Sequence, residues 1–150
     1  MFENIKVPSG LKNPEIFKAV SATLSLSILI QTCHWNVKHG QYAEHLLFQR
    51  LYEGTAGHLD SLAEKLLGLE NDGRIEYHLL MESALSCGKP SEESDVDNCL
   101  LAEQEYINLL TDILLDLESK EEFSKGVDNL FAGIIDDHEE HIYLLKIAKK

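Results

Sequence analysis

Apolar residues recur at helical spacing through four long stretches of this chain, and that periodicity constrains its fold more than any other feature. Only three prolines occur, and none of them interrupts a long stretch: Pro8, Pro14 and Pro90. No stretch alternates apolar and polar residues in the way that a half-buried strand does. The sequence therefore predicts an all-α fold made of long helices.

Helix-start and helix-stop signals divide these stretches. Asn13 and Pro14 mark the start of the first helix, because Asn is a common N-cap and Pro fits the first helical turn. His39-Gly40-Gln41 breaks the chain after it, Asn71-Asp72-Gly73 ends the second helix, and Ser119 to Glu122 forms a tight turn. The long helices are expected at residues 14–37, 42–69, 96–117 and 123–147, with a short extra helix at 75–85.

The polar connection between the second and third long helices decides the topology. It covers residues 71–97 and contains two glycines, Pro90 and an acidic run. Two helices, a long crossover and two more helices are typical of a four-helix bundle with one long connection. A chain of 150 residues, 44% of them hydrophobic, is long enough to bury a core, so we expect a single domain over residues 1–150.

Nothing in the composition favours a secreted or membrane protein. The first residues lack the basic and apolar regions of a signal peptide. No window approaches the run of about 20 apolar residues that a membrane span needs. The three cysteines have no Cys-x-x-Cys spacing, which favours reduced thiols: Cys33, Cys87 and Cys99. We expect a cytoplasmic protein that does not contact a membrane.

The chain is strongly acidic, with 26 acidic against 13 basic residues and a formal charge of −13. Such a surface repels phosphate backbones unless a local basic patch compensates. The lysines near the two ends offer little compensation: Lys6, Lys12, Lys146, Lys149 and Lys150. An acidic surface can attract cations, but it is also simply a soluble surface.

The second long helix carries the residues best suited to metal chemistry. At about 100° per residue, one face spanning roughly 100° bears an imidazole and several carboxylates: His45, Gln49, Glu53, Asp60 and Glu64. This donor mix suits iron and its first-row neighbours. Because a helix rises about 1.5 Å per residue, His45 and Asp60 lie roughly 22 Å apart and cannot hold one ion within one chain. A metal site here needs a symmetric partner; the alternative is a solvated polar face.

The other histidines have simpler explanations from the residues alone. His34 lies near the end of an apolar helix, where a hydrogen-bonded structural histidine is common, and the neighbouring Trp35 suits a core position. His138 and His141 form either a surface cation site or, more commonly, part of a solvated, acid-rich face. His58 lies at about 220° on the helical wheel, away from the candidate face, and is left out of it.

Two segments together resemble the Dps family of mini-ferritins. One is His34-Trp35-Asn36-Val37-Lys38, followed by His45, Asp60 and Glu64, and the other is the tail from Ile134 to Leu145. The long middle connection with its short extra helix also fits, so the resemblance covers nearly the whole chain. It implies a ferritin-like four-helix bundle with a long crossover between helices two and three.

The resemblance also implies an iron-storing cage of twelve subunits with a ferroxidase centre at each twofold interface. His34 and His45 are expected to come from one subunit, and Asp60 and Glu64 from its neighbour, as both catalytic and metal-binding residues. Fe(II) is then oxidised with peroxide or oxygen and deposited as ferric mineral, which relieves oxidative stress. The need for a partner chain agrees with the helical-wheel argument.

The sequence departs from the family pattern at Gln49, where an Asp or Glu is usual four residues after the second histidine. A neutral amide is a weaker iron ligand, and Glu53 and Glu44 are the candidates to compensate. The connection before the second histidine is one residue shorter than usual and contains His39. We therefore expect one firm iron position, a second that is weak or altered, and an attenuated ferroxidase.

Two other functions stay open. One is a metal-binding or structural cage with impaired ferroxidase activity, which Gln49 supports. The other is a nucleoid-associated protein that protects DNA, but this relies on basic tails in the family, and a charge of −13 per copy makes DNA binding doubtful. Ordinary ferritins carry Glu-x-x-His motifs on facing helices, and no Glu here is followed by His three residues later.

Overall fold

The computed structural model describes residues 1–70, 73–120 and 123–150, and these form helices joined by short connections, without any strand. The helices in chain order are α1 (Pro14–Trp35), α2 (Tyr42–Leu69), α3 (Tyr77–Ser86), α4 (Asp95–Glu118) and α5 (Lys125–Ala148). The predicted all-α fold with a short extra helix in the crossover is confirmed. The expected stop at Asn71-Asp72 and the second half of the turn at Glu121-Glu122 lie outside the described residues.

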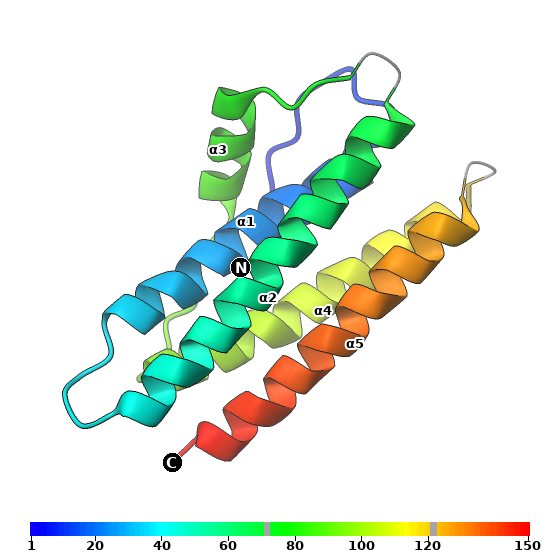
Figure 1. Cartoon of the computed structure of the whole chain (residues 1–150). Helices are drawn as coiled ribbons and strands as arrows, with labels where there is room; N and C mark the ends of the chain where they lie inside the picture. Colours follow the sequence, from blue (N-terminus) through cyan, green and yellow to red (C-terminus); the bar gives the residue numbers. More distant parts are fainter. Residues whose placement is uncertain (71–72, 121–122) are drawn as a thin grey trace.

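The four long helices run side by side, and α3 lies outside them against α1 (Figure 1). Helix α1 packs on α2 and α4, while α5 packs on α4 and α2, so each long helix has two long neighbours. The crossover that contains α3 carries the chain from the end of α2 to the start of α4 (Figure 1). This is the ferritin-like bundle with one long connection.

The core lies between the long helices and consists mostly of aliphatic and phenyl side chains. Phe48 and Leu51 of α2, Leu110 of α4 and Phe131 of α5 are almost fully buried. Burial of one such side chain stabilises the fold by about 1.5–3 kcal/mol relative to exposure. The core therefore fixes the relative positions of the helices on which the polar side chains described below are mounted.

The expectation that no stretch is apolar enough for a membrane span is wrong for helix α1. Its length and composition would allow it to cross a membrane, with a mean hydropathy of 1.5 over its best window. In the structure 61% of that window is buried inside the protein, since α1 contacts α2, α3 and α4. The central helix of a bundle core passes the same composition test, so α1 is explained by its packing.

The Asn13 cap predicted from the sequence does not form, although serine side chains cap two later helices. Ser94 and Ser124 cap α4 and α5, each side-chain oxygen accepting a backbone N–H at 3.1 Å. Asn13 makes no side-chain cap at α1. Instead, the Glu70 carboxylate at the end of α2 accepts the backbone N–H groups of Lys12, at 3.2 Å, and Asn13, at 2.8 Å. A carboxylate at the end of α2 thus holds the backbone just before α1, whereas the Asn13 side chain caps none of the N–H groups of the first turn.

Candidate metal centres

The predicted histidine pair comes together where α1 ends and α2 begins. The rings of His34 and His45 stack with their centroids 3.9 Å apart, and the ring of Tyr52 meets His34 edge-on at 5.2 Å. The connection between the two helices is short, and Gly40 adopts a φ of +87°, which favours glycine. The expected chain break at His39-Gly40-Gln41 is therefore confirmed.

Each ring of this pair binds the backbone of the other helix. Nδ1 of His34 lies 2.9 Å from the carbonyl oxygen of His45, and Nδ1 of His45 lies 3.2 Å from the carbonyl oxygen of His34. A carbonyl oxygen only accepts, so both Nδ1 atoms carry the proton and donate. In the neutral rings both Nε2 atoms then keep a lone pair for a metal ion.

The other predicted residues lie along the same helix but away from this pair. Gln49 donates a hydrogen bond to Glu53 at 3.0 Å. The two side chains considered as ligands of a second iron therefore bind each other. Asp60 and Glu64 are exposed on α2. Asp60 follows His45 by a helical path of about 22 Å, so one copy of the chain does not bring the carboxylates to the histidines.

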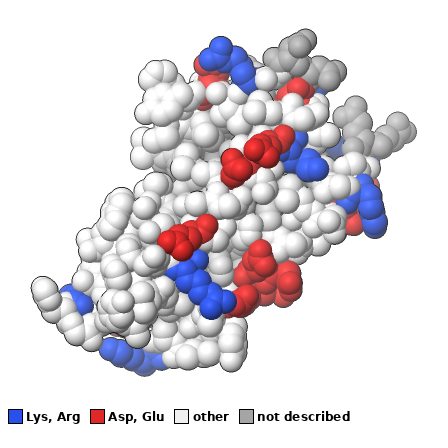
Figure 2. All heavy atoms as spheres, in the orientation of Figure 1, with Lys and Arg blue, Asp and Glu red and all other residues white. Residues whose placement is uncertain are grey.

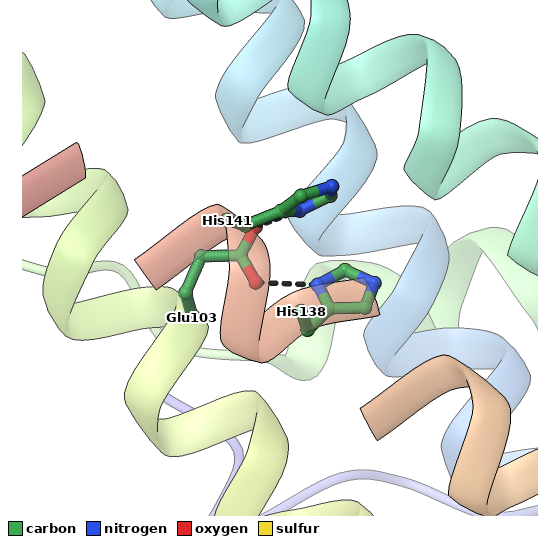
Figure 3. A group of neighbouring side chains, drawn as sticks. All are labelled: Glu103, His138 and His141. Atoms are coloured by element: carbon green, nitrogen blue, oxygen red, sulfur yellow. Dashed lines mark hydrogen bonds and ion pairs between the residues drawn. The ribbon is translucent and has the colours of Figure 1, made fainter. Parts of the chain in front are cut away.

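A second cluster, absent from the sequence-based prediction, lies inside the bundle (Figure 3). Glu103 of α4 sits between His138 and His141 of α5, and all three are buried. Nδ1 of His141 donates to Oε1 of Glu103 at 3.0 Å, and Nδ1 of His138 donates to Oε2. One donor atom from each residue lies within 4.8 Å of the others, which is a spacing that a metal ion could bridge. Figure 3 shows the far ends of both rings pointing away from the carboxylate.

The inner cluster extends to the surface through α2. Nδ1 of His58 lies 2.9 Å from Nε2 of His138, and Nε2 of His58 donates to Oδ2 of Asp137 at 2.8 Å. The ring of Tyr106 packs edge-on against His138, with centroids 4.7 Å apart. His58 does point away from the face of α2 that carries His45, as the helical wheel indicated, and it faces α5.

Burial and hydrogen bonding act in opposite directions on the ionisable groups of this cluster. Burial by itself raises the pKa of Glu103, but attraction to His138 and His141 and their hydrogen bonds outweigh it, so the pKa is lowered. Glu103 is thus an ionised carboxylate that accepts two N–H groups. Burial also lowers the pKa of His58, although the hydrogen bond that His58 donates to Asp137 acts in the opposite direction.

The expectation that His138 and His141 belong to a solvated face is wrong, since their exposed fractions are 0% and 7%. The signal for burial was present in the spacing. Both histidines lie on the apolar stripe of α5, in step with Phe131, Ile134 and Leu145. Glu103 likewise occupies the buried stripe of α4, between Cys99 and Tyr106, among others. An acid on one apolar stripe and two histidines on another predict a buried polar contact, because such groups need partners there.

Comparison with known proteins places this arrangement in a family. A model described as a ferritin-like domain matches residues 16–148. The chain therefore belongs to the ferritin family. No curated protein matches the sequence significantly.

The particular version of the fold is the one found in Dps proteins. Dps from Thermosynechococcus elongatus matches with a TM-score of 0.74 at 17% identity, covering 91% of this chain and 88% of that one. Dps from Microbacterium arborescens in the high iron form gives 0.70 at 15%, over 93% and 99% of the two chains. A Vibrio cholerae O1 DPS protein, described as a member of a broad superfamily of ferritin-like diiron-carboxylate proteins, gives 0.69 at 18%, over 98% of both. The predicted Dps-type fold is confirmed.

Proposed function

We propose that this protein is a cytoplasmic mini-ferritin that oxidises Fe(II) at sites shared between two copies and stores the ferric product inside a twelve-subunit cage. The observation that carries the proposal is the His34–His45 pair, in which both rings are fixed by backbone carbonyls with Nε2 left for a metal. Histidines that bind metals usually donate their other N–H in this way, which fixes both tautomer and orientation.

The remaining ligands in this proposal come from a second copy. Asp60 and Glu64 lie one helical turn apart on the exposed side of α2, so both carboxylates can face a partner. A twofold axis that pairs two α2 helices antiparallel brings the carboxylates of one copy to the histidines of the other. Two equivalent sites result from each such pair.

Exposed apolar side chains around the pair support such a contact. The expectation that Trp35 lies in the core is wrong, since it is 65% exposed. Tyr42 is 71% exposed, and Leu46 is exposed as well. Large apolar side chains gathered on one surface are typical of a protein–protein interface. Their burial between two copies would enclose the histidine pair and the partner's carboxylates together.

The proposed chemistry assigns each residue a role. His34 and His45 bind Fe(II) through Nε2, while Asp60 and Glu64 of the partner copy supply the negative charge that favours Fe(III) over Fe(II). Two Fe(II) ions each give one electron to a peroxide molecule, which takes up two protons and leaves as two waters. With Gln49 in place of a carboxylate, the second iron is held more weakly and the rate is attenuated.

Mixing two inactive variants tests the shared site directly. His34→Ala and Asp60→Ala should each lower peroxide-driven Fe(II) oxidation about tenfold or more, followed by ferric absorbance, while His78→Ala on α3 serves as the matched control. In a co-assembled mixture, an intact site forms wherever a native His34 meets a native Asp60, which at random pairing is about a quarter of the sites. Recovery of that fraction of activity is expected. Alanine variants as active as wild type, or no recovery on mixing, would overturn the shared site, and a particle mass far from twelve chains would overturn the cage.

DNA protection is not favoured by the surface. On the face shown in Figure 2, acidic and basic side chains are interspersed, and neither sign forms a continuous area. The formal charge of −13 per copy accumulates on assembly and opposes binding to a phosphate backbone. A metal reservoir with impaired oxidation is the second candidate function, and the hydrogen bond that ties Gln49 to Glu53 is the observation that favours it.

A further inference from the structure

We propose that His58, His138 and His141 hold a second metal ion within a single copy, a mononuclear divalent ion of the zinc class, at a site separate from the interface centre. The inference goes beyond the proposed ferroxidase, since it needs neither a partner copy nor His34 and Asp60.

The hydrogen bonds of His58 and His138 leave one nitrogen of each ring without a proton. His138 gives its Nδ1 proton to Glu103, and His58 gives its Nε2 proton to Asp137. A neutral imidazole has only one N–H, so the two remaining nitrogens both carry lone pairs, and they face each other at 2.9 Å. Among the described residues no other donor reaches these two nitrogens. A cation between them, either a proton or a metal ion, removes the repulsion.

A third nitrogen with a free lone pair belongs to the same group of rings. His141 also gives its Nδ1 proton to Glu103, which leaves a lone pair on Nε2. The centroids of the His138 and His141 rings are 4.5 Å apart, and Nε2 of His141 lies over Gly54, one turn of α2 before His58. A Cβ at Gly54 would stand 3.5 Å from that nitrogen, so no α2 side chain at this position covers it. The proposed metal ion would take the lone pairs of all three nitrogens, whereas a shared proton takes only two.

The donor set selects the class of ion. Imidazole nitrogens suit Zn(II), Cu(II), Fe(II) and Ni(II) rather than Mg(II) or Ca(II). Each of the three rings already donates its other N–H to a carboxylate, which is the usual arrangement behind histidines that bind metals. Tetrahedral bonds of about 2.05 Å separate two ligand nitrogens by about 3.3 Å, so the gap between His58 and His138 needs to widen only slightly. With three nitrogens and one water the site matches an open zinc site, unlike a carboxylate-rich pair of irons.

The position of the cluster also allows an ion to enter. The side chain of His58 is 14% exposed and that of Asp137 is 57% exposed, whereas Glu103 and His138 are fully buried. An ion therefore reaches the site from the Asp137 side, and a negative charge stands at the entrance.

Zinc binding in a protein that lacks the interface centre tests this inference independently of the proposed function. The double variant His34→Ala/Asp60→Ala is stripped with a chelator, loaded with Zn(II), passed through a desalting column and analysed for zinc per chain by mass spectrometry. We expect one equivalent in this variant. Adding His58→Gln should abolish it, while adding His78→Gln, the exposed control on α3, should leave it. The circular dichroism of each variant verifies that the helices are intact.

A second pair of variants tests the orienting carboxylate. Asp137→Asn should weaken zinc affinity about 10–100-fold in a competition titration, whereas the neighbouring Asp136→Asn should not change it. Co(II) in place of Zn(II) should give the visible absorption of a tetrahedral site in the parent and not in His58→Gln. Failure of the double variant to retain zinc, or retention unchanged by His58→Gln, overturns the inner site and assigns the His58–His138 contact to a shared proton. Neither result bears on the ferroxidase.

Discussion

The two histidine groups of this molecule are built in opposite ways. The His34–His45 pair lies where α1 ends and α2 begins, is held by backbone carbonyls and, in our proposal, is completed by a second copy. The inner cluster around Glu103 is buried, is held by carboxylates and brings Glu103, His138 and His141 together within one copy. Backbone carbonyls fix a ring without adding charge, so the proposed site at His34 and His45 would take its negative groups from a partner. The inner cluster supplies its own negative charge.

The largest expected difference between the two regions is in folding stability. Glu103→Ala leaves two buried N–H groups without an acceptor and breaks a buried charge network, which should cost about 3–5 kcal/mol in the free energy of unfolding. Glu64→Ala on the exposed face of α2 should change it by no more than about 0.5 kcal/mol. Urea denaturation of both metal-free variants measures the contrast. Equal stabilities would show that Glu103 is not the charged centre of the cluster.

The next largest difference between the two regions is expected in how much zinc stabilises the fold. If the inner site binds Zn(II) in the native state only, free zinc at 100 times its dissociation constant should stabilise the fold by about 2.7 kcal/mol. Thermal unfolding with and without zinc measures this shift, and a chelator should reverse it. His34→Ala should keep the shift and His58→Gln should lose it. The opposite pattern would place the stabilising zinc at the outer pair.

A smaller effect is expected from the tyrosine that packs on the inner cluster. The hydroxyl of Thr23 donates to the carbonyl of Ala19, so the hydroxyl of Tyr106 donates to Thr23, at 2.6 Å. Tyr106→Phe removes that donor but leaves Thr23 with a partner, and should cost about 1 kcal/mol. Tyr143→Phe, on a tyrosine that is 62% exposed, is the control and should be near neutral in the same denaturation assay. A loss as large as that of Glu103→Ala would mean that Tyr106 holds the cluster itself.

The smallest stability effect, with a functional gain, is expected at the outer region. Gln49→Asp places a carboxylate on a half-buried position of α2 and should alter the free energy of unfolding by less than about 0.5 kcal/mol. It should raise the rate of Fe(II) oxidation, because it restores a charged ligand for the second iron. Gln104→Asp, at an exposed position of α4, controls for added charge. A rate unaffected by Gln49→Asp would remove the glutamine as the cause of attenuation.

The helices were predictable because local signals agree with tertiary packing along most of the chain. Helix α2 runs from Tyr42 to Leu69, as expected from the glycine before it and its apolar spacing. Helix α5 begins at Lys125 instead of residue 123, because Ser124 supplies the cap. The start of α1 was predicted correctly for an incorrect reason, since the Asn13 side chain makes no cap and the backbone before the helix is held by Glu70, which is distant in sequence.

The two candidate sites were predictable to different degrees for the same physical reason. A motif of neighbouring residues marks the outer pair, and the structure brings His34 and His45 together. The inner cluster joins α4 with α5, and its members look solvated when counted only as charges along the chain. Their common position on apolar stripes becomes meaningful only after the packing of these two helices is known.

The reciprocal bonds of His34 and His45 have a mechanical consequence. Each ring is bound to the main chain of the other helix, so the two hydrogen bonds join the two ends of the loop formed by residues 36–41. A force on either ring is passed to both ends of that loop. Amide exchange in the loop would therefore slow when an ion occupies the rings, and iron loading could be followed from the backbone itself, without any signal from the metal.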